Sequence, residues 1–193
     1  EASKQEIIRR YFDALNALAK GSTSEKEAQK IELLMNMAGI TVTDRKVVIK
    51  ALERAKETDG PAAALELRDG RIITGKTTNL LGASAALLLN VLKVLAGIDH
   101  ETHIISPESI EPIQKLKVDY LKSKNPRLHT DEVLIALSAS AATNPQARLA
   151  LSQLPELAGC QAHTSVMLSD VDIKIFKKLE VQLTSEAVYE HAL

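Results

Sequence analysis

The chain has 193 residues, of which 45% are hydrophobic and 25% are charged, with a formal net charge of −1. This composition is typical of a soluble globular protein that can bury a core. The balanced charge and an aromatic content of 3% argue against a basic nucleic-acid footprint and a base-stacking surface. The single cysteine, Cys160, excludes an intrachain disulfide and a multi-cysteine zinc site, and it favours a reducing, cytoplasmic setting.

Residues 1–59 are predicted to form three helices. Apolar residues recur at helical spacing along the whole segment. Ser24 and Glu27 have the spacing of a capping box at the start of the second helix, and Asp44 suits the start of the third. The stretch DGP at 59–61 cannot prolong a helix, so it marks the best domain boundary.

The stretch GRIITGKT at 70–77 matches the phosphate-binding loop pattern G-x-x-x-x-G-K-[ST]. Such a loop needs flexible residues, whereas the adjacent isoleucines favour an extended strand. Asp69-Gly70 between two short apolar runs instead predicts a hairpin, with Leu67 opposite Ile72. This register places Glu66 opposite Ile73, and it also places Arg68 opposite Arg71, a mildly unfavourable pair. A nucleotide hydrolase is therefore the disfavoured alternative.

Helices and strands alternate in the rest of the chain. The apolar stretch at 80–98 has the length of a membrane span, but the polar residues inside it favour a buried helix, which we expect over 79–97. Further strands are predicted at 102–106, 163–169 and 181–185, and further helices at 107–122, from Thr130, from Asn144-Pro145 and from Ser169. The sequence thus predicts a helical subdomain at 1–60 followed by an α/β subdomain at 61–193.

Two polar loops are candidate binding segments. The first lies between a strand and the long helix, where free N–H groups, hydroxyls and a lysine suit an anion; its residues are Lys76, Thr77, Thr78 and Asn79. The alternative is that Thr78 or Asn79 caps the helix and Lys76 is only solvated. The second loop, at 123–130, concentrates the polar side chains Asn125, Arg127 and His129. The sequence leaves open whether both loops share one site.

Three other patterns have simpler explanations. HETH at 100–103 places its histidines three residues apart, not four as in a zinc-protease helix, so no metal site is expected. Cys160, His163 and Asn144 could in principle form a catalytic trio, but a buried thiol is favoured. A helix junction also gathers small and polar residues, where close helix packing competes with contact to a ligand: Ser138, Ser140, Thr143 and Asn144. We keep Asn144 as a candidate ligand-binding residue.

Several long stretches resemble the C-terminal part of the bacterial UPF0371 (DUF1846) family, and the resemblance covers essentially all of the chain. They include DGRIITGKTTNLLGASAALLLN, HIISPESIEPIQKLK, NPRLHTDEVLIALSASAATNP and LPELAGCQAHTSVMLSDVD. Members are longer, so the chain is expected to be a fragment, in keeping with its lack of an initiator Met. The resemblance implies a three-layer α/β unit with a mixed sheet, similar to the cytidine-deaminase-like topology. The H-x-E and P-C-x-x-C motifs of zinc deaminases are missing, so that chemistry is not carried over with the fold.

The function of the family is not established. We expect a small-molecule or anion-binding module of an enzyme-like protein, with a small anionic ligand, no nucleic acid, no membrane, and self-association into a homo-oligomer. The contrasting hypothesis is a structural or oligomerisation module, with any catalytic site in a domain outside this sequence. The sequence identifies neither a catalytic residue nor a cofactor.

Overall fold

The structure is a computed structural model that describes residues 1–190. The first part of the chain forms three helices and a short 3-10 turn: α1 (Ala2–Ala19), α2 (Glu25–Met37), η1 (Val42–Asp44) and α3 (Lys46–Thr58). The remainder alternates between strands and helices: β1 (Ala62–Glu66), β2 (Ile72–Lys76), α4 (Ala83–Ala96), α5 (Pro107–Lys115), η2 (Leu116–Tyr120), α6 (Thr130–Ser140), α7 (Pro145–Leu151), η3 (Leu154–Leu157), β3 (Gln161–Thr164), α8 (Asp170–Lys178) and β4 (Gln182–Ser185). The predicted α/β class is confirmed.

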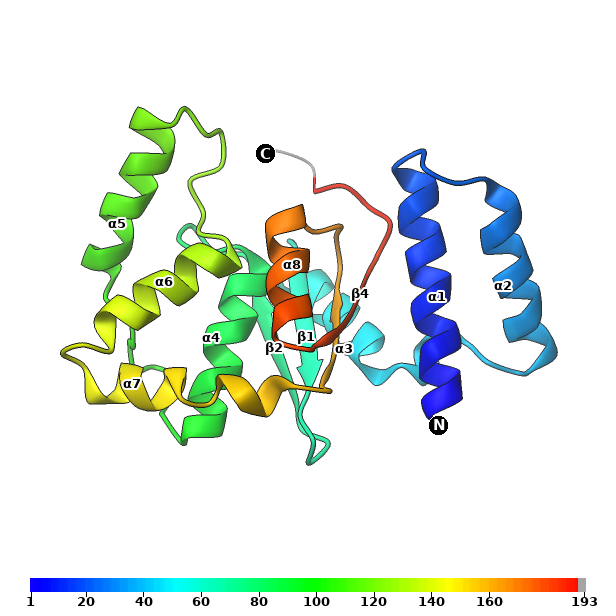
Figure 1. Cartoon of the computed structure of the whole chain (residues 1–193), viewed down its shortest axis with the longest axis horizontal. Helices are drawn as coiled ribbons and strands as arrows, with labels where there is room; N and C mark the ends of the chain where they lie inside the picture. Colours follow the sequence, from blue (N-terminus) through cyan, green and yellow to red (C-terminus); the bar gives the residue numbers. More distant parts are fainter. Residues whose placement is uncertain (191–193) are drawn as a thin grey trace.

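The sheet is mixed, as predicted, and has the order β2-β1-β3-β4. Strand β1 runs antiparallel to both β2 and β3, while β3 and β4 are parallel. The carboxyl ends of β2, β3 and β4 therefore lie at one edge of the sheet. Helix α4 covers one face of the sheet and α3 covers the other (Figure 1). The expected similarity to the cytidine-deaminase-like topology is not confirmed.

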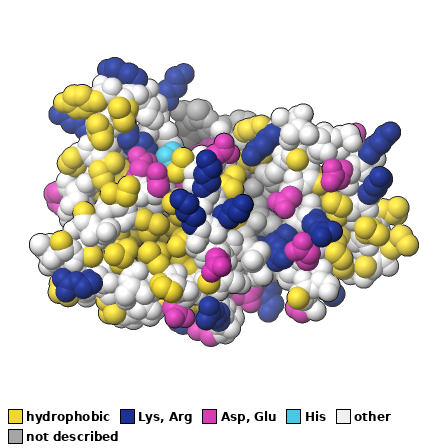
Figure 2. All heavy atoms as spheres, in the orientation of Figure 1, with side chains coloured by type: hydrophobic (Ala, Val, Ile, Leu, Met, Phe, Trp, Pro, Cys, Tyr) yellow, Lys and Arg dark blue, Asp and Glu magenta, His cyan; other side chains and the backbone are white. Residues whose placement is uncertain are grey.

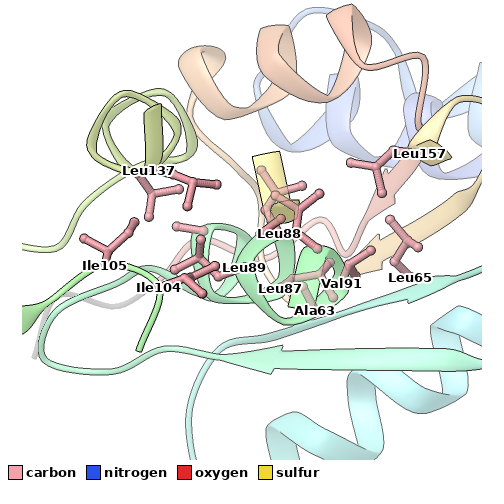
Figure 3. Packing of buried hydrophobic residues seen from close by; sticks show 14 of the residues in the cluster. Ala63, Leu65, Leu87, Leu88, Leu89, Val91, Ile104, Ile105, Leu137 and Leu157 are labelled. Atoms are coloured by element: carbon pink, nitrogen blue, oxygen red, sulfur yellow. The ribbon is translucent and has the colours of Figure 1, made fainter. Parts of the chain in front are cut away.

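Strand β1 is buried on both faces, and its side chains alternate between them. Ala63 and Leu65 belong to the main core, together with the leucines of α4. Ala64 points the other way and packs against Val47 and Ala51 of α3. Figure 3 shows this main core around α4, with Ile104 and Ile105 at one end and Leu157 at the other. A strand between two helical layers explains the nearly continuous apolar run AALEL.

Gly75 lets α4 lie unusually close to β2. A Cβ atom at this position would lie 2.3 Å from the backbone nitrogen of Leu87 and 2.9 Å from the carbonyl oxygen of Ala83. Both atoms belong to the helix backbone, so no side-chain rotation could relieve the contact. The second glycine of GRIITGKT is therefore explained by helix–sheet packing.

The hairpin is confirmed, but its register differs from the prediction by one residue. Glu66 pairs with Ile72 and Leu65 with Ile73, so the turn contains three residues, 68–70. Gly70 adopts φ of 86°, the left-handed conformation that such a turn needs at its last position. This register also avoids the unfavourable pairing of two arginines. Because Ile72–Lys76 is an extended strand and α4 starts only at Ala83, these residues do not form a phosphate-binding loop.

Three further local predictions were wrong. The long helix begins at Ala83 instead of residue 79, because the preceding segment forms a turn in which the Thr78 hydroxyl accepts from the Leu80 and Leu81 amides. Residues 102–106 form no strand: the two isoleucines in this segment are buried in the core instead. Ser24 stands at the start of α2 but makes no capping hydrogen bond.

Arg45, next to α3, is the largest fully buried polar side chain, with 1% of its surface exposed. Its guanidinium donates to the carbonyl oxygens of Ala162 and Gln182, at 2.9 and 2.6 Å, and to the Thr184 hydroxyl at 3.0 Å. It also donates to Gln161. Burial lowers the pKa of Arg45 to about 10. These contacts cross the boundary proposed at residue 60; the division into two subdomains stays a prediction.

The surface mixes acidic and basic side chains, with hydrophobic side chains gathered over α2 at the right of Figure 2. Leu33, Leu34 and Met37 of α2 have exposed fractions of 60%, 58% and 77%. In residues 1–190, no helix combines the length and the apolar character needed to cross a membrane.

Candidate functional site

A cleft of about 150 Å³ lies at the edge of the sheet where β2 and β3 end. We call it the α4 cleft; among the residues that line it are Thr77, Gly82, Ala83, Ser84, Asn125, Arg127, His129, Thr164, Ser169 and Asp172. Helices α4, α6 and α8 all begin at this edge, toward the top of Figure 1. Each helix start carries a partial positive charge, so their convergence favours an anion.

Two of these three helix starts are capped by the protein itself. At α6, the Thr130 amide donates to Asp172 Oδ1 at 2.9 Å, and the His129 amide donates to Glu132 Oε1 at 2.9 Å. At α8, Ser169 Oγ accepts from the Asp172 amide at 3.3 Å. These bonds satisfy N–H groups that a helix leaves free at its first turn.

The start of α4 is different. Gly82 occupies the capping position and has no side chain to accept a hydrogen bond. The next residues, Ala83, Ser84 and Ala85, are buried, and no hydrogen bond formed among residues 1–190 uses their amides. Ser84 is 3% exposed, and its Oγ is buried and lacks a hydrogen-bond partner in the described part of the chain. A buried hydroxyl without a partner costs about 1–3 kcal/mol.

The Ser84 hydroxyl lines the α4 cleft together with the uncapped amides, and this combination is what a bound oxyanion would satisfy. The cleft has room for about five water molecules at about 30 Å³ each, which is enough for a phosphate or carboxylate group. The cleft thus combines room for a small group with buried donors that lack partners in the described residues.

Asp172 connects two of the helix starts and the imidazole of His129. Its carboxylate, 6% exposed as a residue, accepts from the Thr130 hydroxyl at 2.6 Å and lies 3.3 Å from His129 Nδ1. Burial alone would raise the pKa of Asp172, but its hydrogen bonds with His129 and Thr130 together lower it. The same hydrogen bond with Asp172 raises the pKa of His129, against the opposite effect of burial. The pair therefore favours a charged imidazolium beside an ionised carboxylate.

The loop at 123–130 is held against the segment before α4. Arg127 Nε donates to the Thr78 carbonyl oxygen at 2.8 Å. The Leu128 amide donates to the Leu80 carbonyl oxygen, and the Leu128 carbonyl oxygen accepts from the Gly82 amide. Lys117 also holds the loop, because its Nζ donates to the Arg127 carbonyl oxygen at 2.5 Å and to Glu132 Oε1 at 2.7 Å. Arg127 also pairs with Glu190 at 3.5 Å, an exposed contact that a stronger anion could replace.

The structure thus brings together one residue of the first predicted loop and three of the second. Thr77 lines the α4 cleft with Asn125, Arg127 and His129. Lys76, Thr78 and Asn79 line a different cleft, on the other side of the segment that joins β2 to α4. Asn144 lies at the start of α7, where its Oδ1 accepts from the Gln146 and Ala147 amides. The binding roles of all eight residues stay predictions.

The other patterns in the sequence form no joint site in the described part of the chain. His163 is fully buried and bonds to Thr184 and Glu186, while Cys160 Sγ faces the Glu156 carbonyl. Burial lowers the pKa of His163 and raises that of Cys160, so neither suits a thiolate–imidazolium pair. Among residues 1–190, no cluster of three His, Cys, Asp or Glu side chains could hold a metal ion.

Sequence reasoning missed Ser84 and the role of Asp172. Ser84 is a lone hydroxyl within the most apolar helix, which was a usable signal because such a group needs a partner when buried. Asp172 lies in the helix predicted to start at Ser169, and the sequence analysis gave it no role of its own. Its contact with the start of α6 joins residues more than forty positions apart, as in the Thr130–Asp172 bond, and no local pattern indicates it.

Comparison with known proteins identifies the family. Residues 43–193 match the family model described as "Domain of unknown function DUF1846, C-terminal". The chain belongs to the UPF0371 (DUF1846) family. A UPF0371 protein of Corynebacterium aurimucosum is 58% identical over 189 residues, which cover 98% of this chain and 38% of that protein. UPF0371 proteins of Corynebacterium urealyticum and Streptococcus pyogenes are 55% and 48% identical over 98% and 99% of this chain.

The chain spans about two fifths of the length of these relatives, 38% of the first and 39% of the Streptococcus pyogenes protein. The relatives are named only as UPF0371 proteins, and the matching domain is one of unknown function. Membership of the family, which the sequence predicted, is thereby confirmed, and the family has no assigned activity to transfer to the α4 cleft.

Proposed function

We propose that this part of the UPF0371 protein is a small-anion-binding module, and that the α4 cleft holds the phosphate or carboxylate group of its ligand. The observation that carries the proposal is the start of α4, where Ser84 Oγ and the neighbouring amides are buried without partners within residues 1–190. A bound oxyanion would accept hydrogen bonds from these donors and gain from the dipole of α4.

The surrounding side chains have complementary roles in this proposal. At the rim of the cleft, the ligand competes with Glu190 for Arg127 and lies beside the imidazolium of His129, which is paired with Asp172. Asp172 orients His129 and fixes the starts of α6 and α8, so the cleft is formed before a ligand enters. A preformed site loses less ordering entropy on binding. We place this module in the cytoplasm, in keeping with the single buried thiol of Cys160.

Replacing Ser84 with alanine is expected to weaken the binding of inorganic phosphate about tenfold or more, since a hydrogen bond to a charged group contributes about 1.5–3 kcal/mol. Isothermal titration calorimetry of the chain and of the Ser84→Ala variant measures the two affinities. The matched control is Ser138→Ala, because Ser138 is an exposed serine in a helix that does not line the cleft. Equal phosphate affinity in all three proteins, or no phosphate binding to the unmodified chain, would contradict the proposal.

Sulfate binding is expected to weaken several-fold as the pH rises through the pKa of His129. The hydrogen bond with Asp172 raises this pKa above the usual value of about 6.5, so the positive charge is present at lower pH and lost at higher pH. Sulfate is the better probe here because its own charge stays constant between about pH 5 and 9, unlike that of phosphate. Calorimetry across this range should give a sloping profile for the chain and a flat one for His129→Gln; the same slope in both would show that another group titrates.

An assembly module is the second candidate function. The apolar side chains Leu33, Leu34 and Met37 on the exposed face of α2 favour it, because exposed apolar groups of this kind can contact another protein surface. The self-association predicted from the sequence fits this candidate. Failure of the phosphate titration above would leave assembly as the better-supported function.

A further inference from the structure

A second and larger cleft of about 580 Å³ lies on the other side of the segment that joins β2 to α4. We call it the Lys76 cleft; its walls are the end of β2, one side of α4, the start of α5 and the segment around residues 100–107. Its volume is within the range of about 300–1,000 Å³ that small-molecule sites occupy. The α4 cleft and the Lys76 cleft have no lining residue in common.

The floor of the Lys76 cleft is apolar. Its side chains come from α4 (Leu89), from the segment before α5 (Ile104 and Ile105) and from α5 itself (Ile110). Each of these four residues is at most 8% exposed. Figure 3 shows Leu89, Ile104 and Ile105 at the same end of the core. The two isoleucines belong to the stretch that the sequence assigned to a strand. In the structure they instead form a core surface beside which an apolar ligand body could lie.

The rim of the Lys76 cleft is basic. Its basic lining residues are Arg54, Lys76 and Lys93, together with the histidines His100 and His103. Within residues 1–190, Glu101 is the single acidic residue of this lining. Arg54 Nε is buried and has no hydrogen-bond partner in the described residues, while another nitrogen of the same guanidinium pairs with Glu57 at 3.2 Å. Lys76 is exposed and forms no ion pair with another described residue, so its charge is available. A basic rim above an apolar floor is complementary to an anion with an apolar body.

We propose that the Lys76 cleft binds an organic acid with an aliphatic body, whose acid group contacts Lys76 and Arg54 while its chain covers Leu89 and the isoleucines. This ligand class differs from the small oxyanion of the α4 cleft because it needs an apolar part. Lys76 and Asn79, which the sequence singled out for anion binding, would then act in this cleft and not at the start of α4. The proposal does not depend on the α4 cleft.

Calorimetric titration with octanoate tests the proposal, with octylammonium and acetate as matched probes. The chain is expected to bind octanoate at least tenfold more tightly than octylammonium, which has the same aliphatic body and the opposite charge. The affinity should also rise about threefold to fourfold for each methylene added from hexanoate to octanoate. Acetate should bind at least tenfold more weakly than octanoate. Equal affinity for octanoate and octylammonium, or no octanoate binding, would overturn the proposal.

Variants assign the binding to this cleft. Lys76→Gln is expected to weaken octanoate binding at least fivefold, whereas Lys178→Gln, another exposed lysine outside both clefts, should leave it unchanged. Ser84→Ala should also leave octanoate binding unchanged, so failure here and failure of the α4 cleft can be told apart. An unchanged octanoate affinity in Lys76→Gln would overturn the proposal.

Discussion

Replacing Gly75 with alanine is expected to lower the free energy of unfolding by about 3 kcal/mol or more, because the added methyl group would enter the backbone of α4. The new Cβ would lie 2.3 Å from the Leu87 nitrogen and 2.6 Å from its Cα, so the helix or the strand must move as a whole. Chemical denaturation of the chain and the variant, followed by circular dichroism, measures the difference. The result also bears on GRIITGKT, since the second glycine of that stretch is here required for packing.

Gly60→Ala is the matched control for this substitution. A Cβ at Gly60 would approach only the Thr58 carbonyl oxygen, at 3.8 Å, which is an ordinary contact. This variant is expected to change the free energy of unfolding by less than about 1 kcal/mol. If Gly75→Ala is as stable as Gly60→Ala, then α4 does not pack on β2 as closely as described.

Replacing Arg45 with methionine is expected to cost about 3–5 kcal/mol of stability. Methionine keeps much of the aliphatic volume but removes the donors to the Ala162 and Gln182 carbonyl oxygens and to the Thr184 hydroxyl. Each buried acceptor that loses its partner costs about 1–3 kcal/mol. The same denaturation experiment measures the loss.

Arg10→Met is the control for the loss of an arginine. Its side chain is 71% exposed and, among residues 1–190, pairs only with Glu6 across one helical turn, so its removal should change stability by less than about 0.5 kcal/mol. An Arg45→Met variant that is no less stable than Arg10→Met would mean that the buried guanidinium does not link the first helices to the sheet.

Local patterns predicted the helix starts with strong chemical signals. Asn144-Pro145 and Ser169 were both placed correctly, and each caps its helix through its own side chain. The Asp69-Gly70 hairpin was also predicted, although its register was not. Turn residues fix the position of a hairpin, whereas the choice between a two-residue and a three-residue loop depends on which side chains must face the core.

The α4 cleft could be predicted only in part. The polar loop at 123–130 was recognised from its composition, and three of its side chains do line the cleft. The start of α4 at Ala83 could not be read from sequence because the segment before it is held by hydrogen bonds to Leu128, far along the chain. The same non-local contacts place Thr77 and Lys76, adjacent in sequence, in different clefts.

The most direct test of the central claim is one comparison of the chain with Ser84→Ala, in which phosphate affinity and the free energy of unfolding are measured on the same samples. A buried hydroxyl that lacks a partner within residues 1–190 does not stabilise the fold, so the ligand-free variant should be at least as stable as the chain. The same variant should bind phosphate more weakly by about tenfold or more. A variant that is less stable by 1 kcal/mol or so and binds phosphate equally well would show that Ser84 serves the fold, and that the α4 cleft is not an oxyanion site.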